Sequence, residues 1–410
     1  MSSPARTDVA VTGLGLVTPA GIGVAANWER ISSGRSTASP DDNLTGLGVD
    51  FSCRVPGFDA GALLGRRNAW RLDRVAHLAI VAAREAVADA GLDPATWDGA
   101  RVGVVVGSSF GGSATYEREQ ARLAEDGPDM ISPLLMVMAP VNMTAGYLAI
   151  DQHALGPNLV VSTACAAGTS AIGTARHLLA AGMCDVVIAG GSESTITRTT
   201  MASLHRMGAL STRRDSPETA SRPFDADRDG FVAGEGAGML ILERAADAQA
   251  RQARVYAHVS GYGASADGHH PSSPHPEGDG AERAIRAALA DAGVEPGDIG
   301  HVNAHGTATA MNDVTEARVI RRVLGDHPAV TSTKGVIGHL IGAAGAVEAA
   351  YTVLAVHHGS IPPTANLSSL DPEIELDVVA KDARPATLRA ALSNSFGFGG
   401  QNAAVVVTAP

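Results

Sequence analysis

Hydrophobic and polar positions along this chain form two kinds of segment: short apolar runs, and longer stretches with a helical period. In residues 72–91, apolar side chains recur every three or four positions up to Gly91, which predicts an amphipathic helix. Strands that alternate with such helices indicate an α/β fold with mostly parallel sheets covered on both faces. Short apolar runs predict strands at 9–17, 101–107, 159–161 and 403–408, and two further strands are predicted to begin at residues 299 and 330.

Two parts of this pattern occur twice, in the same order. The segment ADAGLDP at 88–94 matches ADAGVEP at 290–296, and each follows a predicted helix and precedes a predicted strand. VSTAC at 161–165 precedes a small-residue helix, as does TSTKG at 331–335. Because both order and context repeat, we predict duplicated α/β halves with their boundary near residue 255.

The predicted first half, residues 1–255, presents Cys165 where a strand ends and a helix of small residues begins. Free N–H groups and the macrodipole at a helix N-terminus favour the thiolate, which is the nucleophilic form. The small residues at 164 and 166–168 are expected to leave room for a substrate beside the sulfur. A buried structural cysteine is the alternative.

The predicted second half, residues 256–410, places its polar side chains in the same way. One strand delivers His305 into a turn, and another strand end carries Lys334 and His339. A single histidine is compatible with a core position. Several at glycine-rich strand ends indicate one chemical site, because ligands of open α/β sheets bind at the carboxyl ends of the strands.

Composition limits the possible classes of protein. With 410 residues, 45% of them hydrophobic, the chain can bury the cores of two packed halves. The net charge of −12 and the lack of a basic run argue against nucleic acid as a partner. The 3 cysteines have no paired spacing, which fits a reducing compartment. Residues 1–8 do not resemble a signal peptide and no run could span a bilayer, so we expect a cytoplasmic protein without membrane contact.

Some motif-like patterns are incomplete. Gly13-x-Gly15 has Thr18 where a dinucleotide fingerprint needs its third glycine. The calcium-loop start at 225–230 has Gly236 where the last ligand should be. We therefore expect no metal site, although some histidines leave that alternative open. These are His301 with His305, whose spacing suits a zinc helix but which lie in a predicted strand, and the loop cluster His269, His270 and His275.

At these motifs the chain resembles the β-ketoacyl-(acyl carrier protein) synthases, the condensing enzymes of type II fatty-acid and polyketide synthesis. Thr-Ala-Cys, Asn-Ala-His-Gly-Thr and Thr-Lys-x-x-x-Gly-His occur in the family's order, and the similarity runs from residues 11–15 to 394–400. The resemblance implies a thiolase-like fold, two duplicated α/β halves in a layered αβαβα arrangement. It also implies decarboxylative condensation with malonyl-acyl carrier protein and no cofactor beyond the carrier's phosphopantetheine arm.

The resemblance assigns roles to the central residues. Cys165 takes the acyl chain as a thioester, and its own N–H and that of Phe398 form the oxyanion hole. His305 and His339 hold the malonyl thioester carbonyl, promote the loss of carbon dioxide and stabilise the enolate. Neutral imidazoles with donor nitrogens suit that task, because negative charge develops on the oxygen.

Further roles follow from the same resemblance. Lys334 matches the family's buried lysine, and Glu316 is its expected acidic partner, because a buried ammonium needs one. Lys334 could serve direct chemistry or only orient the site. Thr307, Thr309 and Ser272 are expected to bind the phosphopantetheine arm, although the threonines could equally be turn residues.

The segment 396–400, Phe-Gly-Phe-Gly-Gly, resembles the family's gating loop. Its glycines, including Gly399, permit unusual backbone angles, and Phe398 is expected to swing beside Phe396 to admit the acyl chain. A glycine-rich hairpin would look similar in other strand-rich proteins.

Three positions depart from the common fatty-acid pattern. Phe110 stands where those members often have a smaller aliphatic residue that lines the acyl pocket, so we expect short, or flat and unsaturated, chains. Ala308 and Gln401 also depart, without a firm account. Together they favour polyketide, and possibly polyene, synthesis over housekeeping fatty-acid synthesis.

The expected partner is the acidic acyl carrier protein, which must find a local basic patch on this acidic chain. Arg66 and Arg206 are the first candidates for docking, although a solvated charged face is the default. The other arginines of these two patches are Arg67, Arg71, Arg213 and Arg214.

Three functional classes remain from the sequence. The first is an active condensing enzyme, either a homodimer or a heterodimer with a homologous chain-length-factor subunit. The second is that silent structural partner itself, which Cys165 argues against. The third is a coenzyme A-dependent thiolase or chalcone-type enzyme, which the pair His305 and His339 argues against.

Overall fold

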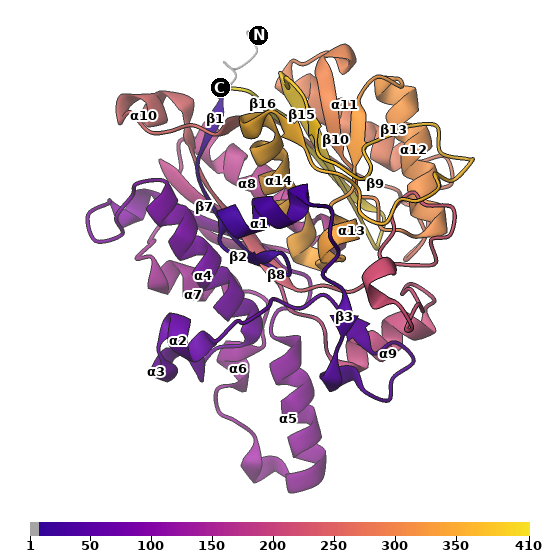
Figure 1. The fold of residues 1–410 in the computed structure, drawn as a ribbon. Helices are drawn as coiled ribbons and strands as arrows, with labels where there is room; N and C mark the ends of the chain where they lie inside the picture. The colour runs from indigo at the N-terminus through magenta and orange to yellow at the C-terminus, as the bar shows by residue number, and fades with distance from the viewer. Residues whose placement is uncertain (1–7) are drawn as a thin grey trace.

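Strand β1 (Val9–Thr18) lies at the centre of the fold, in a computed structural model that describes residues 8–410 (Figure 1). It pairs antiparallel with β8 (Gly236–Arg244) on one side and β9 (Ala257–Ala266) on the other, so that the described residues form one 12-stranded sheet. Its order is β13 (Asp377–Val378), β11 (Ala329–Thr331), β10 (Ile299–Asn303), β15 (Ala390–Gly397), β16 (Gln401–Thr408), β9, β1, β8, β7 (Val186–Glu193), β5 (Val102–Gly107) and β6 (Asn158–Val161), with β2 (Gly21–Ile22) beside β1.

The direction of strand pairing changes across this sheet. The outer strands pair in parallel, β5 with β6 and β7, and β10 with β11 and β15. The central strands β1, β8, β9 and β16 pair antiparallel. Every residue of β5 is buried, as are all but the last of β8, which explains their continuous apolar runs.

Helices cover the sheet in layers (Figure 1). On the outside, α4 (Arg74–Asp89) packs on β1 and β8, α7 (Met143–Asp151) packs on β5, and α11 (Asp279–Ala292) packs on β9 and β16 beside α12 (Ala310–Leu324). Between the two parts of the sheet, α8 (Ala167–Ala180) packs against α14 (Ala344–His358). The predicted αβαβα layering is therefore confirmed.

The repeated sequence segments occupy equivalent places. Residues 88–94 end α4 and lead to β5, and residues 290–296 end α11 and lead to β10. Residue 255 lies between α10 (Ala245–Ala250) and β9. The division of the chain into 1–255 and 256–410 stays a prediction.

Gly13 and Gly15 let β1 approach α4 closely. A Cβ added at Gly13 would lie 2.2 Å from the carbonyl oxygen of Ala86, and one at Gly15 would lie 1.9 Å from that of Ala82. Close packing therefore explains this glycine pair without a dinucleotide.

Shorter elements connect the layers. The helices are α1 (Val24–Ser32), α2 (Ala60–Leu64), α3 (Arg66–Ala69), α5 (Ser113–Asp126), α6 (Leu135–Met138), α9 (Arg198–Arg206) and α13 (Lys334–Ile337), and the strand pairs are β3 (Ser39–Pro40) with β4 (Phe51–Ser52) and β12 (Ser360–Ile361) with β14 (Arg384–Pro385).

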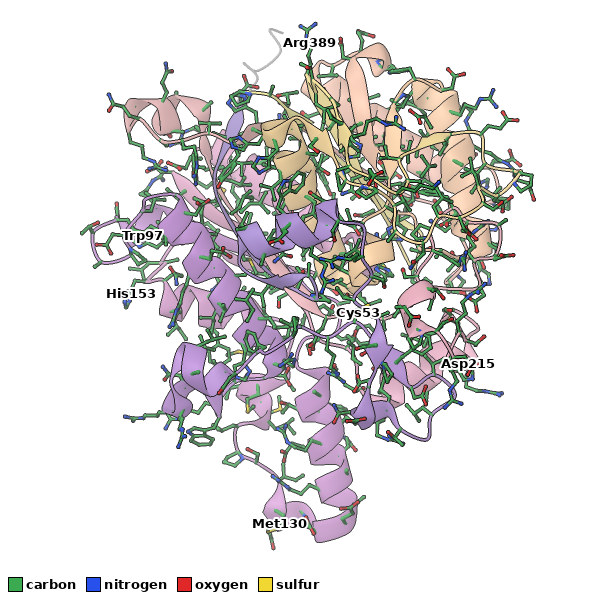
Figure 2. All side chains as sticks on the ribbon, viewed as in Figure 1. Cys53, Trp97, Met130, His153, Asp215 and Arg389 are labelled. Carbon is green, nitrogen blue, oxygen red and sulfur yellow. The ribbon has the colours of Figure 1, made fainter. Side chains whose placement is uncertain are left out.

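Within residues 8–410, no helix combines the length and the apolar character needed to cross a membrane. The expectation that residues 1–8 carry no signal peptide falls, except for Asp8, outside the described residues. The three cysteines, Cys53, Cys165 and Cys184, are all free and buried, and Figure 2 labels Cys53 among the side chains.

Candidate active site

Cys165 lies in the turn that joins β6 to α8, as the sequence predicts. The turn is a short 3₁₀ helix (Ala164–Ala166), and Ala164 adopts a left-handed φ of 48°. That conformation costs a non-glycine residue roughly 1–2 kcal/mol. The strained turn directs Cys165 into a pocket of about 710 Å³, where its side chain is 6% exposed.

The small residues after Cys165 serve packing rather than substrate binding. Ala166, Ala167 and Gly168 are buried, and of the small residues at 164 and 166–168 only Ala164 lines the pocket. A Cβ added at Gly168 would lie 2.5 Å from the backbone nitrogen of Ala346 in α14. The prediction that residues 166–168 leave room for a substrate is therefore wrong, because they let α8 and α14 pack closely together.

The resting sulfur of Cys165 is a thiol, not the thiolate that the helix N-terminus led us to expect. Burial raises the pKa of Cys165 to about 11, although the charge of Lys334 and the backbone N–H groups of Phe398 and Cys165 itself lower it. Desolvation therefore outweighs the helix terminus. The same two N–H groups point toward the sulfur, beside which the carbonyl oxygen of an acyl group on Cys165 would lie.

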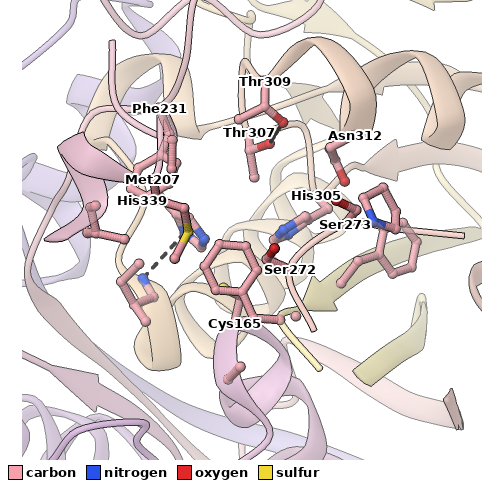
Figure 3. Close-up of a pocket in the computed structure, with 18 of the residues that line it drawn as sticks. Cys165, Met207, Phe231, Ser272, Ser273, His305, Thr307, Thr309, Asn312 and His339 are labelled. Atoms are coloured by element: carbon pink, nitrogen blue, oxygen red, sulfur yellow. Dashed lines mark hydrogen bonds between the residues drawn. The ribbon is translucent and has the colours of Figure 1, made fainter. Parts of the chain in front are cut away.

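The two histidines face the pocket together (Figure 3). The rings of His305 and His339 meet edge to face, with centroids 5.4 Å apart. Burial and the positive charge of Lys334 hold the pKa of both well below the usual histidine range. Both imidazoles are therefore neutral at physiological pH.

The hydrogen bonds of His339 define its tautomer. The backbone N–H of Ile341 donates to Nδ1 of His339 at 3.3 Å, which leaves the ring proton on Nε2. Phe231 packs edge to face on the same ring at a centroid distance of 5.1 Å. His339 therefore offers a donor nitrogen to the pocket from a fixed orientation.

Glu316 supports the turn that carries His305. Its carboxylate accepts hydrogen bonds from the backbone N–H groups of His305 and Gly306, both at 2.8 Å, and from the side-chain amide of Asn394 at 3.2 Å. Glu316 is 1% exposed and does not line the pocket.

The partner of Lys334 is Glu348, not Glu316 as predicted. The ammonium of Lys334 forms an ion pair with Oε1 of Glu348, and each side chain is 1% exposed. Burial raises the pKa of Glu348 to about 7, while Lys334 lowers it. Glu316 cannot serve because its oxygens already accept the backbone N–H groups of the His305 turn. The only sequence signal for Glu348 is its position as a lone carboxylate inside the apolar helix α14.

The pocket is lined from both halves of the chain. Cys165 and Phe110 come from the first half. The lining residues from the second half that the sequence singled out are Ser272, His305, Thr307, Thr309, His339, Phe396, Phe398 and Gln401. Figure 3 shows the threonines beside one another, and their hydroxyl oxygens are 2.9 Å apart.

The loop between β15 and β16 closes one side of the pocket. Phe398 is 39% exposed at its tip, and Gly399 and Gly400 both adopt positive φ, 82° and 70°. The N–H of Gly399 donates to the carbonyl of Pro271 at 2.7 Å. The predicted need for glycine in this loop is therefore confirmed by its backbone angles.

Ala308 is buried beside the pocket with a left-handed φ of 65°, and its carbonyl accepts a hydrogen bond from the N–H of Gly230. A glycine would adopt this conformation without strain. The alanine at position 308, where relatives more often have serine or glycine, therefore affects the backbone conformation. Gln401, by contrast, lines the pocket.

Arg66 and Arg206 lie outside the pocket lining, both exposed, in α3 and at the end of α9. Arg206 is the neighbour of Met207, which does line the pocket and is 53% exposed. One candidate cation is thus close to the pocket in sequence.

The candidate metal ligands have other contacts. Asp225 accepts hydrogen bonds from the backbone N–H groups of Asp227, Ser368 and Ser369. Across residues 8–410, no group of three or more histidine, cysteine or acidic side chains is arranged to hold a metal ion.

Comparison with known proteins identifies the family. The model of the β-ketoacyl synthase N-terminal domain matches residues 6–248, and that of the C-terminal domain matches residues 256–368. The 3-oxoacyl-[acyl-carrier-protein] synthase 2 of Synechocystis sp. is 43% identical over 409 residues, 98% of each chain. The enzyme of that name from Staphylococcus aureus is 41% identical over 406 residues, 97% of each chain.

Solved structures show the same fold. The ishigamide ketosynthase/chain length factor superimposes with a TM-score of 0.93 at 36% identity, covering 99% of this chain and 100% of the other. A type II PKS ketosynthase complex with its acyl-carrier protein gives 0.91 at 32% identity, with coverage of 99% and 100%. The predicted thiolase-like fold is thus confirmed, and the chain belongs to the β-ketoacyl synthase family, the enzymes that condense an acyl group with malonyl-acyl carrier protein.

Proposed function

We propose that Cys165, His305 and His339 carry out the condensation, because the structure brings these three side chains to one pocket. The sulfur attacks the carrier-bound thioester, a new carbon–sulfur bond forms as the carrier's carbon–sulfur bond breaks, and the thiol proton passes to the released carrier thiolate. The proton must leave as the sulfur attacks, since the resting group is a thiol. The N–H groups of Cys165 and Phe398 hold the carbonyl oxygen during this transfer.

In the second step the two imidazoles act as neutral donors. His305 and His339 bind the malonyl thioester oxygen, carbon dioxide leaves, and the resulting enolate carbon attacks the acyl-cysteine carbonyl. The carbon–sulfur bond to Cys165 then breaks, and the released thiolate takes up a proton from water. Burial supports this role, together with the charge of Lys334, because both lower the pKa of the two histidines and keep them unprotonated. Thr307, Thr309 and Ser272, on the pocket wall, hold the phosphopantetheine arm.

We place this activity in type II polyketide synthesis, with short or flat unsaturated chains as substrates. Phe110 supports this, because its ring stands on the pocket wall just after β5. Housekeeping fatty-acid synthesis is the alternative, and the relatives from Synechocystis sp. and Staphylococcus aureus favour it. A location in the cytoplasm and the absence of a resident cofactor belong to the same proposal.

The first experiment is the intact mass of the protein after incubation with short and long acyl-carrier proteins, with Cys165→Ser as control. We expect one acyl group on the wild type and none on the variant. A reaction that starts only when a co-encoded homologue is added would identify an obligate heterodimer. If no adduct forms under any condition, the proposal is contradicted. The result would then favour a silent structural partner or an enzyme that uses coenzyme A thioesters.

Replacing Phe110 by isoleucine should widen the acceptance of acyl chains. Removal of the ring lengthens the pocket, so the acylation rate with a long saturated chain should rise about tenfold relative to a short one. The ratio of the two rates, followed by intact mass, measures this. An unchanged ratio would show that Phe110 does not limit chain length.

The proposed partners are an acyl carrier protein and a second ketosynthase-like chain, identical or homologous. Neighbouring structures contain a ketosynthase with its acyl-carrier protein and ketosynthases with chain length factors. This chain carries a net charge of −12, so an acidic carrier must bind where cations such as Arg66 and Arg206 are exposed.

Charge reversal at Arg206 should weaken carrier binding without impairing the chemistry. Arg206→Glu is expected to raise the KM for acyl-carrier protein about five- to tenfold and to leave kcat nearly unchanged. Arg286→Glu is the matched control, because Arg286 is exposed on α11, where it pairs with Glu282. Equal effects of the two reversals would rule out a specific docking role for Arg206.

A further inference from the structure

Glu193 is a buried glutamate that the proposed reaction does not use. It ends β7 and is 0% exposed. Its carboxylate accepts hydrogen bonds from the backbone N–H groups of Ser109, Phe110 and Gly342 and from the hydroxyl of Ser108. The N–H of Ser109 is 2.6 Å from Oε2, and the hydroxyl of Ser108 is 3.4 Å from Oε1.

These donors belong to two separate walls of the pocket. Phe110 follows β5 and lines the pocket. Gly342 lies in the 3₁₀ helix Ile341–Ala343, whose first residue, Ile341, also lines the pocket and donates to His339. One carboxylate therefore joins the wall that carries Phe110 to the wall that carries Ile341.

Ser109, which binds Glu193, also contacts the turn that carries Cys165. The hydroxyl of Ser109 donates to the carbonyl of Ala164, the residue before Cys165, at 3.0 Å. The fit is tight, because a Cβ added at Gly342 would lie 2.5 Å from Oε2 of Glu193 and 2.7 Å from the nitrogen of Ser109. Burial raises the pKa of Glu193 to about 7 while its four donors lower it, so the charged form depends on these loop contacts.

We propose that Glu193 is a positioning residue that holds the walls carrying Phe110 and Ile341 in place around Cys165, and thereby sets which acyl chains are accepted. Glu193 acts through the loops it binds, because it does not itself line the pocket. The inference rests on the proposed function, since it requires Cys165 to carry the acyl chain.

The test is Glu193→Gln, which keeps the shape of the side chain but turns one acceptor oxygen into a donor nitrogen. A glutamine remains neutral, so the variant avoids a buried charge. We expect the ratio of acylation rates for four-carbon and twelve-carbon acyl-carrier proteins, followed by intact mass, to change about fivefold or more. A purely structural role would lower both rates by the same factor and leave the ratio unchanged, which would overturn the inference.

Two further comparisons sharpen the test. Glu243→Gln is the matched control, because Glu243 is a buried carboxylate that binds Thr12 and Arg251 outside the pocket. In this variant the ratio of the two acylation rates should stay at the wild-type value. In a Phe110→Ala background the effect of Glu193→Gln should shrink, since coupled residues are not additive. Full additivity would contradict action through Phe110.

Gly342→Ala is the second variant if Glu193→Gln does not fold. The added methyl group presses on the same carboxylate, so the ratio should shift here too, and an unchanged ratio would again overturn the inference. If the wild-type protein itself forms no acyl adduct, this result overturns the proposed function, and the inference with it, before any variant is compared.

Discussion

Replacing Cys165 by alanine should abolish acyl transfer and lower condensation by at least about 10⁴-fold, because loss of a nucleophile removes the covalent step entirely. Decarboxylation of malonyl-acyl carrier protein should persist, since His305 and His339 come from other elements and keep their orientation. Intact mass reports the acyl group, and release of carbon dioxide reports decarboxylation.

Cys184→Ala is the matched control for this experiment. Cys184 is also a free and fully buried thiol, but it does not line the pocket. The control should therefore still form the acyl-enzyme. An adduct on Cys165→Ala, or a complete loss of decarboxylation in that folded variant, would contradict the division of work between cysteine and histidines.

Breaking the pair between Lys334 and Glu348 should have the second large effect, on stability. Lys334→Met leaves the carboxyl of Glu348 buried without its cation, which typically costs about 3–5 kcal/mol when such a charge stays in place. The pKa of Glu348, already about 7 with the ammonium present, should rise further in the variant.

The sign of the pH dependence follows from that shift. The folded pKa of Glu348 lies above its unfolded value, so the unfolding free energy falls as pH rises from the unfolded to the folded pKa. In Lys334→Met the unfolding free energy continues to fall above pH 7. The difference in unfolding free energy between the wild type and the variant should therefore be larger at pH 8 than at pH 6. Urea unfolding at both values measures it.

The double variant Lys334→Met/Glu348→Gln separates charge from packing. Because the double variant lacks the carboxylate, it should regain most of the unfolding free energy that Lys334→Met loses at pH 8. Its loss relative to the wild type should then be no larger at pH 8 than at pH 6. A single variant as stable as the wild type at both pH values would show that the pair contributes nothing to folding.

The sequence predicted the elements around the site because their signals are local. Periodic apolar positions located α4, and an apolar run located β5, with bounds that differ by two residues or fewer. The candidate residues Cys165 and His305 were found because each follows a predicted strand, where an α/β fold binds its ligands, whereas His339 lies after α13 and not at the end of β11.

Three features could not be read from the sequence because they depend on what lies across the fold. Glu316 and Glu348 are carboxylates in two helices of the second half, α12 and α14, and only the packing of α14 decides which one faces Lys334. The pKa of Cys165 depends on burial that the helix-terminus argument ignores. No local sequence pattern connects Glu193 to the Phe110 loop. Ser109, whose N–H binds Glu193, is 84 residues away in the sequence.

The central place of β1 has a consequence for biosynthesis. β1 is synthesised long before β8 and β9, its main partners, because these strands start at residues 236 and 257. Most backbone N–H and C=O groups along its two edges therefore stay unpaired until β8 and β9 have been synthesised, and unpaired strand edges invite aggregation. Folding must finish after synthesis of the second half, and the yield of native protein should depend on chaperones and on low temperature more than its final stability suggests.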